Sequence, residues 1–422
     1  MDKLIVEGSG RLSGTIRVSG SKNACLPILA ATLLSGESCN ISNVPDLRDV
    51  STMIKILSSL GRCAVRSGDC IKVSSGEAKS HTAIYELVST MRASIVVLGP
   101  LLARYGEAKV SFPGGCVIGP RPIDLHFKGL RALGAEISIK EGYIVAKAKK
   151  LRGTRVYLGG HFGSSVLATA NTLMAAVLAE GKTVIENAAC EPEIADLAGF
   201  LTAMGALIKG AGTPTITISG VKKLTGADYR IIPDRIEAGT YMIAAVLTGG
   251  DLFLEEARVE HNLALFDKLK ETGGVVEEKE NGIRVYRERE VISATDITTN
   301  TYPGFPTDLQ AQMMSLMIGA DGISVITEKI YPDRFIHISE MNRMGAGIRL
   351  EGSTAIIKGN GKLSGAPVMA SDLRASAALV LAGLVAEGRT EISRIYHLDR
   401  GYEHIEDKLS AVGAKIWREK EQ

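Results

Sequence analysis

Segments rich in Ala, Leu and Met recur along the chain, and each is followed by a short β-like stretch. Residues 173–180, for example, read Leu-Met-Ala-Ala-Val-Leu-Ala-Glu, and Thr183-Val184-Ile185 follows them. Apolar segments of the first kind are typical of buried helices, and short β-branched stretches are typical of strands. Their alternation predicts an α/β chain.

Glycine follows the helix-like segments at regular intervals. Because glycine takes the left-handed conformation without a Cβ penalty, it is the expected residue just past a helix end. Twelve predicted helix ends in register indicate six copies of a unit with two helices and several strands. One series is Gly61, Gly134, Gly205, Gly273, Gly345 and Gly413, and the interleaved series is Gly36, Gly106, Gly181, Gly250, Gly322 and Gly388.

Leu-x-Gly tripeptides mark the starts of several units. Those at 12–14, 151–153, 224–226 and 363–365 are predicted to open the first strands of units one, three, four and six. This arrangement predicts two domains of three units each, with a boundary near residues 224–233. A six-unit solenoid is the alternative, but no unit looks like a terminal cap, and the irregular loops differ from unit to unit.

Composition and charge exclude several classes of function. The 422 residues include 49 Lys and Arg against 47 Asp and Glu, so the net charge is +2. This balance provides no electrostatic reason to expect a nucleic acid or an anionic membrane as partner. The N-terminus lacks the basic start and apolar core of a signal peptide. The longest apolar stretch, residues 375–386, is shorter than the ~20 residues of a membrane span, so we expect a cytoplasmic protein.

Cations recur at predicted helix N-termini, where a positive charge opposes the helix dipole. Their placement predicts an anion site built from backbone N–H groups and side-chain cations. Asp234 and Ser165, at corresponding helix starts, are equally compatible with ordinary N-caps. A near-neutral chain with such cations favours a small ligand bearing phosphate or carboxylate over a polymer. The cations are Lys22, Arg92 and Arg374 at the first helices of their units, and Arg121, Arg334 and Arg400 before the second helices.

The segment 113–122 differs from the other loops, because it contains three glycines and three prolines. Cys116 lies in it close to Arg121, and a neighbouring cation stabilises a thiolate. We therefore predict a functional thiol at Cys116. The other five cysteines are predicted to be small buried hydrophobes. There is no CxxC pair, so the sequence indicates neither a zinc site nor a disulfide framework.

Eight segments, taken in order, are highly specific together although each is weak alone. They are residues 19–24 (Ser-Gly-Ser-Lys-Asn-Ala), 113–116 (Pro-Gly-Gly-Cys), 121–125 (Arg-Pro-Ile-Asp-Leu), 191–194 (Glu-Pro-Glu-Ile), 232–237 (Ile-Pro-Asp-Arg-Ile-Glu), 303–308 (Pro-Gly-Phe-Pro-Thr-Asp), 372–375 (Asp-Leu-Arg-Ala) and 397–402 (His-Leu-Asp-Arg-Gly-Tyr). On the basis of these segments, which span essentially the whole chain, the sequence resembles the enolpyruvyl transferase family, in its UDP-N-acetylglucosamine 1-carboxyvinyltransferase branch.

The resemblance implies an α/β fold of two domains, each of three βαβαββ units, joined by a double crossover with the active site in the interdomain cleft. It implies domains at 22–232 and at 1–21 plus 233–422. The implied reaction transfers the enolpyruvyl group of phosphoenolpyruvate to the 3′-hydroxyl of UDP-N-acetylglucosamine and releases phosphate. It proceeds by addition and elimination through a tetrahedral ketal, begins peptidoglycan synthesis, and needs no metal or organic cofactor.

The resemblance also assigns roles to individual residues. Cys116 is implied as the acid that can form an adduct with phosphoenolpyruvate, and Asp308 as the base for the sugar hydroxyl. Lys22, Arg121 and Arg400 would hold the phosphate of phosphoenolpyruvate, and Arg334 and Arg374 its carboxylate side. For the rest of the cleft, the implied contacts are Asn23 with the sugar; Pro122, Ile123, Asp124, Leu125 and Ile330 with the uridine; Ser165 and Val166 with the diphosphate; and Arg92 and Asp372 as supports.

One position departs from the family pattern, and two other functions remain as alternatives. Leu167 stands where family members often have glycine, and a lysine common nearby is absent; both affect diphosphate contacts and not the chemistry. The first alternative is the sister transferase that acts on shikimate 3-phosphate, against which the Cys116 loop and residues 121–125 argue. The second is a catalytically silent repeat scaffold that binds a nucleotide sugar. It gives no reason for Cys116, Asp308 and the cations to occur together.

Overall fold

The computed structural model describes residues 2–114 and 123–420, and it divides into two compact lobes. Lobe 1 comprises the described residues from Gly20 to Ile232, and lobe 2 comprises those up to Ser19 and from Pro233 onward. Among the described residues, no helix combines the length and apolarity that crossing a bilayer requires.

Lobe 1 contains three four-stranded sheets of the same order, in which an edge strand lies parallel to the second strand and the other two are antiparallel. The sheets are β14 (Asp228–Arg230), β3 (Cys39–Ser42), β5 (Cys70–Val73), β4 (Ala64–Ser67); β6 (Thr82–Ala83), β7 (Glu107–Ser111), β9 (Tyr143–Lys147), β8 (Glu136–Lys140); and β10 (Arg155–Tyr157), β11 (Lys182–Glu186), β13 (Thr215–Ser219), β12 (Leu207–Lys209). The helices are α1 (Lys22–Ala31), η1 (Thr32–Leu34), α2 (Arg48–Ser59), α3 (Tyr85–Val88), η2 (Arg92–Val97), α4 (Leu98–Tyr105), α5 (Asp124–Ala132), α6 (Val166–Ala176) and α7 (Pro192–Ala203).

Lobe 2 repeats this sheet order three times and adds one short strand pair. The sheets are β2 (Ser13–Arg17), β15 (Asp251–Glu255), β17 (Gly282–Arg287), β16 (Gly274–Lys279); β19 (Ile297–Thr298), β21 (Ile323–Thr327), β23 (Thr354–Lys358), β22 (Gly347–Glu351); β24 (Pro367–Met369), β25 (Arg389–Ser393), β1 (Asp2–Glu7), β26 (Lys415–Lys420); and the pair β18 (Ile292–Ser293) with β20 (Ala320–Asp321). The helices are α8 (Arg235–Thr248), η3 (Val259–His261), α9 (Leu263–Glu271), η4 (Thr307–Leu309), α10 (Gln310–Ile318), α11 (Ile338–Arg343), α12 (Leu373–Val385), η5 (Ile395–Arg400) and α13 (Ile405–Ser410).

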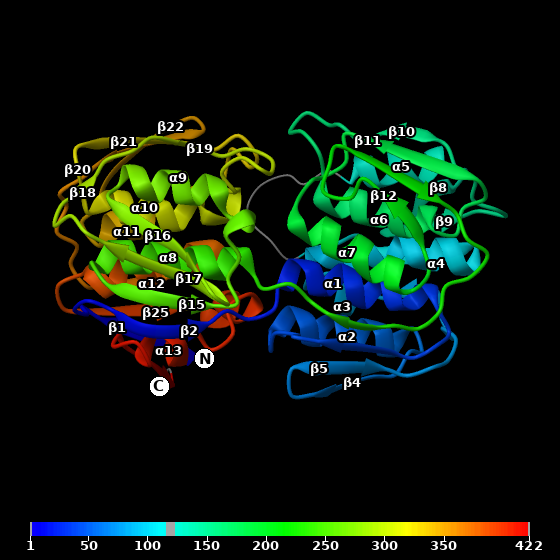
Figure 1. The fold of residues 1–422 in the computed structure, drawn as a ribbon, viewed down its shortest axis with the longest axis horizontal. Helices are drawn as coiled ribbons and strands as arrows, with labels where there is room; N and C mark the ends of the chain where they lie inside the picture. Colours follow the sequence, from blue (N-terminus) through cyan, green and yellow to red (C-terminus); the bar gives the residue numbers. More distant parts are fainter. Residues whose placement is uncertain (1, 115–122, 421–422) are drawn as a thin grey trace. The chain divides into compact units, whose positions relative to one another are not determined.

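Two strands belong to different units from those predicted. The strand after 12–14, β2, pairs in parallel with β15 of unit four, and the strand after 224–226, β14, pairs with β3 of unit one. The predicted assignment to units one and four was therefore wrong, because a Leu-x-Gly start carries no information about which sheet the strand joins. The N-terminal strand β1 likewise completes unit six between β25 and β26. Figure 1 shows β1 and β2 in blue among the green-to-red elements of lobe 2.

The two glycine series have different structural roles. All six glycines of the first series have φ between +93° and +101°, so their prediction as left-handed residues after helices is confirmed. In the second series, Gly106 ends α4 in the left-handed conformation. However, Gly181, Gly322 and Gly388 lie several residues past their helices and directly before strands, so their prediction as helix ends was wrong.

The first helices of the units form the centre of each lobe. In lobe 2, α8, α10 and α12 pack against one another, and nearly all of their residues are buried. In lobe 1, α6 packs against η2 and α4, and α1 also contacts η2. Burial on all sides explains why these helices are apolar throughout rather than amphipathic. Their starts carry the polar residues that the sequence singled out.

Candidate active site

The starts of α8, η4 and α12 in lobe 2 each carry an aspartate. Asp234 accepts N–H bonds from Ile236 and Glu237 at 2.8 and 3.1 Å, and Asp372 caps α12 in the same way. The N-cap interpretation of Asp234 is therefore confirmed. Asp308 differs, because its carboxylate is bound by two guanidinium groups.

Asp308 lies between Arg334 and Arg374. Nη1 of Arg334 is 2.7 Å from Oδ1 of Asp308, and Nη2 of Arg374 is 3.0 Å from Oδ2. The arginine side chains are 6% and 2% exposed, whereas that of Asp308 is 26% exposed. The structure thus brings together three residues that the sequence predicted separately.

Both guanidinium groups are held in the charged form. Burial lowers the pKa of Arg334, but the carboxylates of Asp308 and Asp372 outweigh it and raise the pKa above its ordinary value. Burial of Arg374 is likewise outweighed, chiefly by Asp308, and its pKa is raised. Nε and Nη1 of Arg374 are buried without a hydrogen-bond partner among the described residues. The guanidinium of Arg374 also lies over the ring of Tyr402, at 5.5 Å from the ring centroid.

A buried polar cluster beneath Asp308 was not predicted from the sequence. Nε2 of Gln312 donates to the backbone oxygen of Asp308 at 2.8 Å and to the hydroxyl of Tyr402 at 3.1 Å. The hydroxyl groups of Tyr402 and Thr240 are 2.8 Å apart, and the guanidinium of Arg374 lies over the Tyr402 ring. These contacts hold α8, α10 and α12 in register. The sequence signal that would have marked Gln312 is a polar residue within an apolar helix.

The helix starts of lobe 1 carry a second set of predicted residues. Lys22 is the first residue of α1, and its buried Nζ is 3.5 Å from Oδ2 of Asp49. Arg92 begins η2 and is half-buried. Ser165 accepts the N–H of Ala168 at 3.4 Å, so its N-cap interpretation is confirmed.

His126 supports this part of lobe 1 and was not predicted. Asn171 uses its Oδ1 to accept the N–H of Gly99 and its Nδ2 to donate to Ile95, both on the segment that follows Arg92. This orients Nδ2 as the donor to Nδ1 of His126 at 2.9 Å. Burial, followed by the charge of Arg92, lowers the pKa of His126 to about 3, so the ring is neutral.

The other predicted residues are distributed over both lobes. Arg400 ends η5 and is half-buried. Cys116, Arg121 and Pro122 lie outside the described residues. The remaining positions are Asn23 in α1; Ile123, Asp124 and Leu125 at the start of α5; Val166 at the start of α6; and Ile330, after β21.

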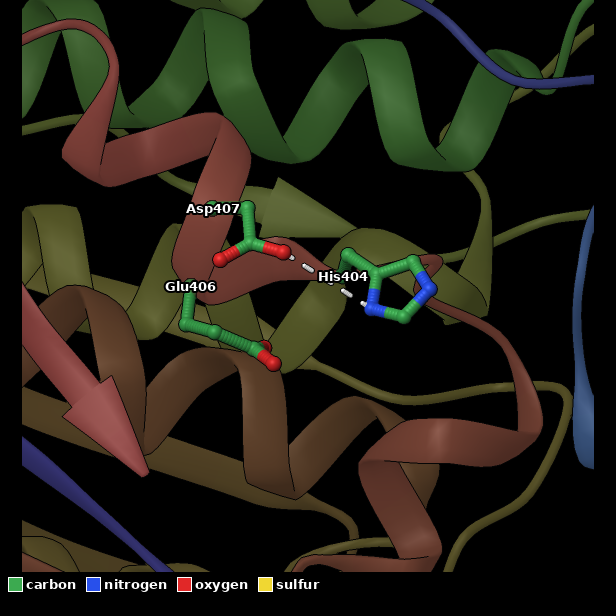
Figure 2. A group of neighbouring side chains, drawn as sticks. All are labelled: His404, Glu406 and Asp407. Carbon is green, nitrogen blue, oxygen red and sulfur yellow. Dashed lines mark ion pairs between the residues drawn. The ribbon is translucent and has the colours of Figure 1, made fainter. Parts of the chain in front are cut away.

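A third group of acidic and histidine side chains occurs at α13. His404, Glu406 and Asp407 have ligand atoms within 4.8 Å of one another. Figure 2 shows the His404 ring and the Asp407 carboxylate pointing toward each other, at 3.8 Å. Glu406, however, is bound by Nε and Nη2 of Arg418. Because that guanidinium already neutralises Glu406, the group is a poor cation site.

Comparison with known proteins assigns the chain to a family. The family model described as EPSP synthase (3-phosphoshikimate 1-carboxyvinyltransferase) matches residues 6–409. The chain belongs to the EPSP synthase family. Within it, the chain is 55% identical over 421 residues to a UDP-N-acetylglucosamine 1-carboxyvinyltransferase of Geotalea uraniireducens, covering 100% of both chains. A protein of the same name from Methylacidiphilum infernorum is 56% identical over 418 residues and 99% of each chain.

Two solved structures confirm the predicted enolpyruvyl-transferase fold. The enolpyruvyl transferase NikO from Streptomyces tendae superposes with a TM-score of 0.90 at 24% identity, covering 100% of this chain and 99% of that one. EPSP synthase from Acinetobacter baumannii superposes with a TM-score of 0.76 at 18% identity, covering 99% and 100%. At these identities the likeness concerns the fold alone.

Proposed function

We propose that this protein transfers the enolpyruvyl group of phosphoenolpyruvate to the 3′-hydroxyl of UDP-N-acetylglucosamine and releases phosphate. The observation that carries the proposal is the Asp308 carboxylate, held between two buried, charged guanidinium groups at 2.7 and 3.0 Å. It occurs in a chain that is 54–56% identical over its full length to proteins named for this transfer.

The addition step requires a base, an acid and cations. Asp308 is proposed to accept the proton of the sugar hydroxyl while the hydroxyl oxygen forms a bond to C2 of phosphoenolpyruvate. Cys116 is proposed to supply a proton to C3. Elimination then breaks the bond between C2 and the phosphate oxygen and removes a proton from C3, which restores the double bond between C2 and C3. Charged donors stabilise the anionic groups throughout both steps.

The cations are divided between the two ends of phosphoenolpyruvate. Arg334 and Arg374 are proposed to bind its carboxylate, a role supported by the raised pKa of both guanidinium groups, which keeps them charged. Lys22, Arg121 and Arg400 are proposed to bind its phosphate. The proposal therefore draws residues from both lobes, which we propose act as the two functional domains.

The remaining assignments concern UDP-N-acetylglucosamine. Helix N-termini bind phosphate through free N–H groups, and Ser165 and Val166 occupy such a start at α6. They are proposed to lie at the diphosphate, where the neighbouring Leu167 is half-buried. The other proposed contacts are Asn23 with the sugar; Pro122, Ile123, Asp124, Leu125 and Ile330 with the uridine; and Arg92 and Asp372 as supports of the catalytic residues.

A phosphate-release assay tests the proposal. Purified protein is mixed with phosphoenolpyruvate alone, with added UDP-N-acetylglucosamine, and with added shikimate 3-phosphate. We expect phosphate only in the second mixture, together with a nucleotide-sugar product heavier by one enolpyruvyl group. Phosphate release with shikimate 3-phosphate, or without any acceptor, would overturn the assignment.

A further inference from the structure

Glu328 is a fully buried carboxylate that the proposed mechanism does not use. It follows directly after β21, and it is 0% exposed. A buried carboxylate is costly unless donors surround it. The donors around Glu328 therefore indicate what the residue organises.

Four groups of lobe 2 donate hydrogen bonds to Glu328. Oε1 accepts from the Thr299 hydroxyl at 2.7 Å and from the backbone N–H groups of Ile330 and Tyr331 at 2.7 and 2.9 Å. Oε2 accepts from the Thr307 hydroxyl at 2.8 Å. These contacts connect the residue after β19 and the segment after β21 to Thr307, the residue that precedes Asp308.

Thr307 links Glu328 to the arginine at Asp308. A hydroxyl has one hydrogen, and that of Thr307 is directed to the carboxylate of Glu328, which can only accept. The Thr307 oxygen is then left to accept from Nη1 of Arg334, at 3.1 Å. The same Nη1 also donates to Asp308 at 2.7 Å.

We propose that Glu328 is a positioning residue, which acts through the Thr307 hydroxyl to hold the Arg334 guanidinium in place for the carboxylate of the substrate. The inference rests on the proposed function, because that function assigns the phosphoenolpyruvate carboxylate to Arg334. Glu328 touches no reacting atom. Its negative charge sets the direction of the Thr307 hydrogen, and that direction gives Arg334 an acceptor beside Asp308.

Two variants at Thr307 separate the hydroxyl from the shape of the side chain. Thr307→Val keeps the volume and removes the hydroxyl, whereas Thr307→Ser keeps the hydroxyl. We expect Thr307→Val to raise the KM for phosphoenolpyruvate about tenfold or more, with the KM for UDP-N-acetylglucosamine changed less than about threefold. Thr307→Ser should remain within about threefold of the wild type for both substrates. Equal effects of Val and Ser, or equal changes in both KM values, would overturn the proposal.

Variants at the carboxylate and at its other hydroxyl donor complete the test. Glu328→Gln introduces an amide that can donate to Thr307 and reverse its hydrogen, so it should reproduce the raised KM for phosphoenolpyruvate. Thr299→Val removes a donor from the same carboxylate without touching Arg334. It should lower the thermal midpoint and leave the KM for phosphoenolpyruvate within about twofold. A rise as large as that of Thr307→Val would show a general structural effect and contradict the proposal.

The wild type tests the proposed function independently of this inference. If it releases phosphate with an acceptor other than UDP-N-acetylglucosamine, the proposed acceptor is wrong. The comparison of Thr307 and Thr299 variants then stands with that acceptor, because it measures the KM for phosphoenolpyruvate. If no acceptor supports phosphate release from phosphoenolpyruvate, both the function and the positioning role are overturned.

Discussion

The carboxylate of Asp308 accepts a hydrogen bond of 2.7 Å from the guanidinium of Arg334, which lies 26 positions away in the chain. The same guanidinium is the one proposed to bind the substrate carboxylate. Asp308 therefore offsets part of the positive charge of Arg334 and Arg374 while its own side chain remains 26% exposed. Asp308 thus combines contact with two cations with a side chain that is partly accessible.

Replacing Asp308 by Asn should abolish turnover, because the amide cannot accept the hydroxyl proton. The change also leaves two buried guanidinium groups without their anion, and we expect a loss of roughly 1–3 kcal/mol in the free energy of unfolding. Phosphate release and thermal unfolding measure the two effects, and the far-ultraviolet circular dichroism spectrum should match the wild type. Wild-type turnover in the variant would remove Asp308 from the chemistry.

Fosfomycin should alkylate Cys116 and leave the other cysteines unlabelled, because an activated thiol is expected at Cys116 alone. Cys25 and Cys39 are buried, and burial raises the pKa of Cys25 to about 12. Cys63 and Cys70 are exposed, so the prediction that they are buried was wrong, and Cys63 serves as an internal comparison. Peptide mapping by mass spectrometry locates the label, with Cys116→Ser and Cys63→Ser as matched variants. Label on Cys63, or label that survives in Cys116→Ser, would contradict the assignment.

Lys408 should stabilise the segment at Ser19, where the chain passes from lobe 2 to lobe 1. Its Nζ donates to Oε1 of Glu237 at 2.7 Å and to Oγ of Ser19 at 2.6 Å. Glu237 is 2% exposed, so Lys408→Met leaves a buried carboxylate without its cation, and we expect a loss of about 2 kcal/mol.

The matched control for Lys408 is Lys150, which pairs with Glu180 at 2.8 Å while both side chains are more than half exposed. Solvent screens such a pair, so Lys150→Met should leave the midpoint of denaturant unfolding unchanged. Equal stability of the two variants would show that the Lys408–Glu237 pair adds no more to the free energy of unfolding than an exposed pair does.

His126 should make the protein sensitive to acid. The ordinary pKa of histidine is ~6.5, and in the folded protein burial lowers that of His126 to about 3. As the pH falls below 6.5 the unfolded chain binds a proton first, so this contribution to stability is complete above pH 6.5 and is lost toward pH 3. At pH 5 the loss from His126 is about 2 kcal/mol.

The acid sensitivity is tested with His126→Gln, which keeps an acceptor for Asn171 and does not titrate. Unfolding free energies at pH 7 and pH 5 should differ less for this variant than for the wild type. The control His161→Gln changes an exposed histidine and should leave the wild-type difference intact. Identical pH dependence in His126→Gln and the wild type would refute a buried, neutral His126.

Gly20 should not tolerate a side chain. A Cβ at this position would lie 1.7 Å from the backbone oxygen of Asn43, and backbone at such a distance must move. Gly20→Ala should therefore lower stability by roughly 3 kcal/mol or more or prevent soluble expression. Gly10 has no atom within 4 Å of the same position, so Gly10→Ala should behave as the wild type. Soluble yield and thermal midpoint are the measurements. A stable Gly20→Ala protein would contradict the close approach of the Asn43 backbone to Gly20.

The local elements followed directly from the sequence. The six first-series glycines end helices because only a residue without Cβ takes φ near +95° at no cost, and this requirement acts within a few residues. The caps at Asp234 and Ser165 are equally local, since the side chain bonds to N–H groups of the next three residues. Regular spacing of such signals was sufficient to predict six α/β units.

Partners distant in the chain required the tertiary structure. β2 and β14 carry the same kind of start signal, yet each joins the sheet that was predicted for the other. Their hydrogen-bonding partners are strands more than 180 residues away in the chain. Glu328 gave no signal, because its role depends on hydroxyl groups that only the fold brings to it. Short-range sterics and capping depend on neighbouring residues. The charge pairing of Asp308, Arg334 and Arg374 instead requires the fold to bring together the start of η4, the turn after β21 and the start of α12.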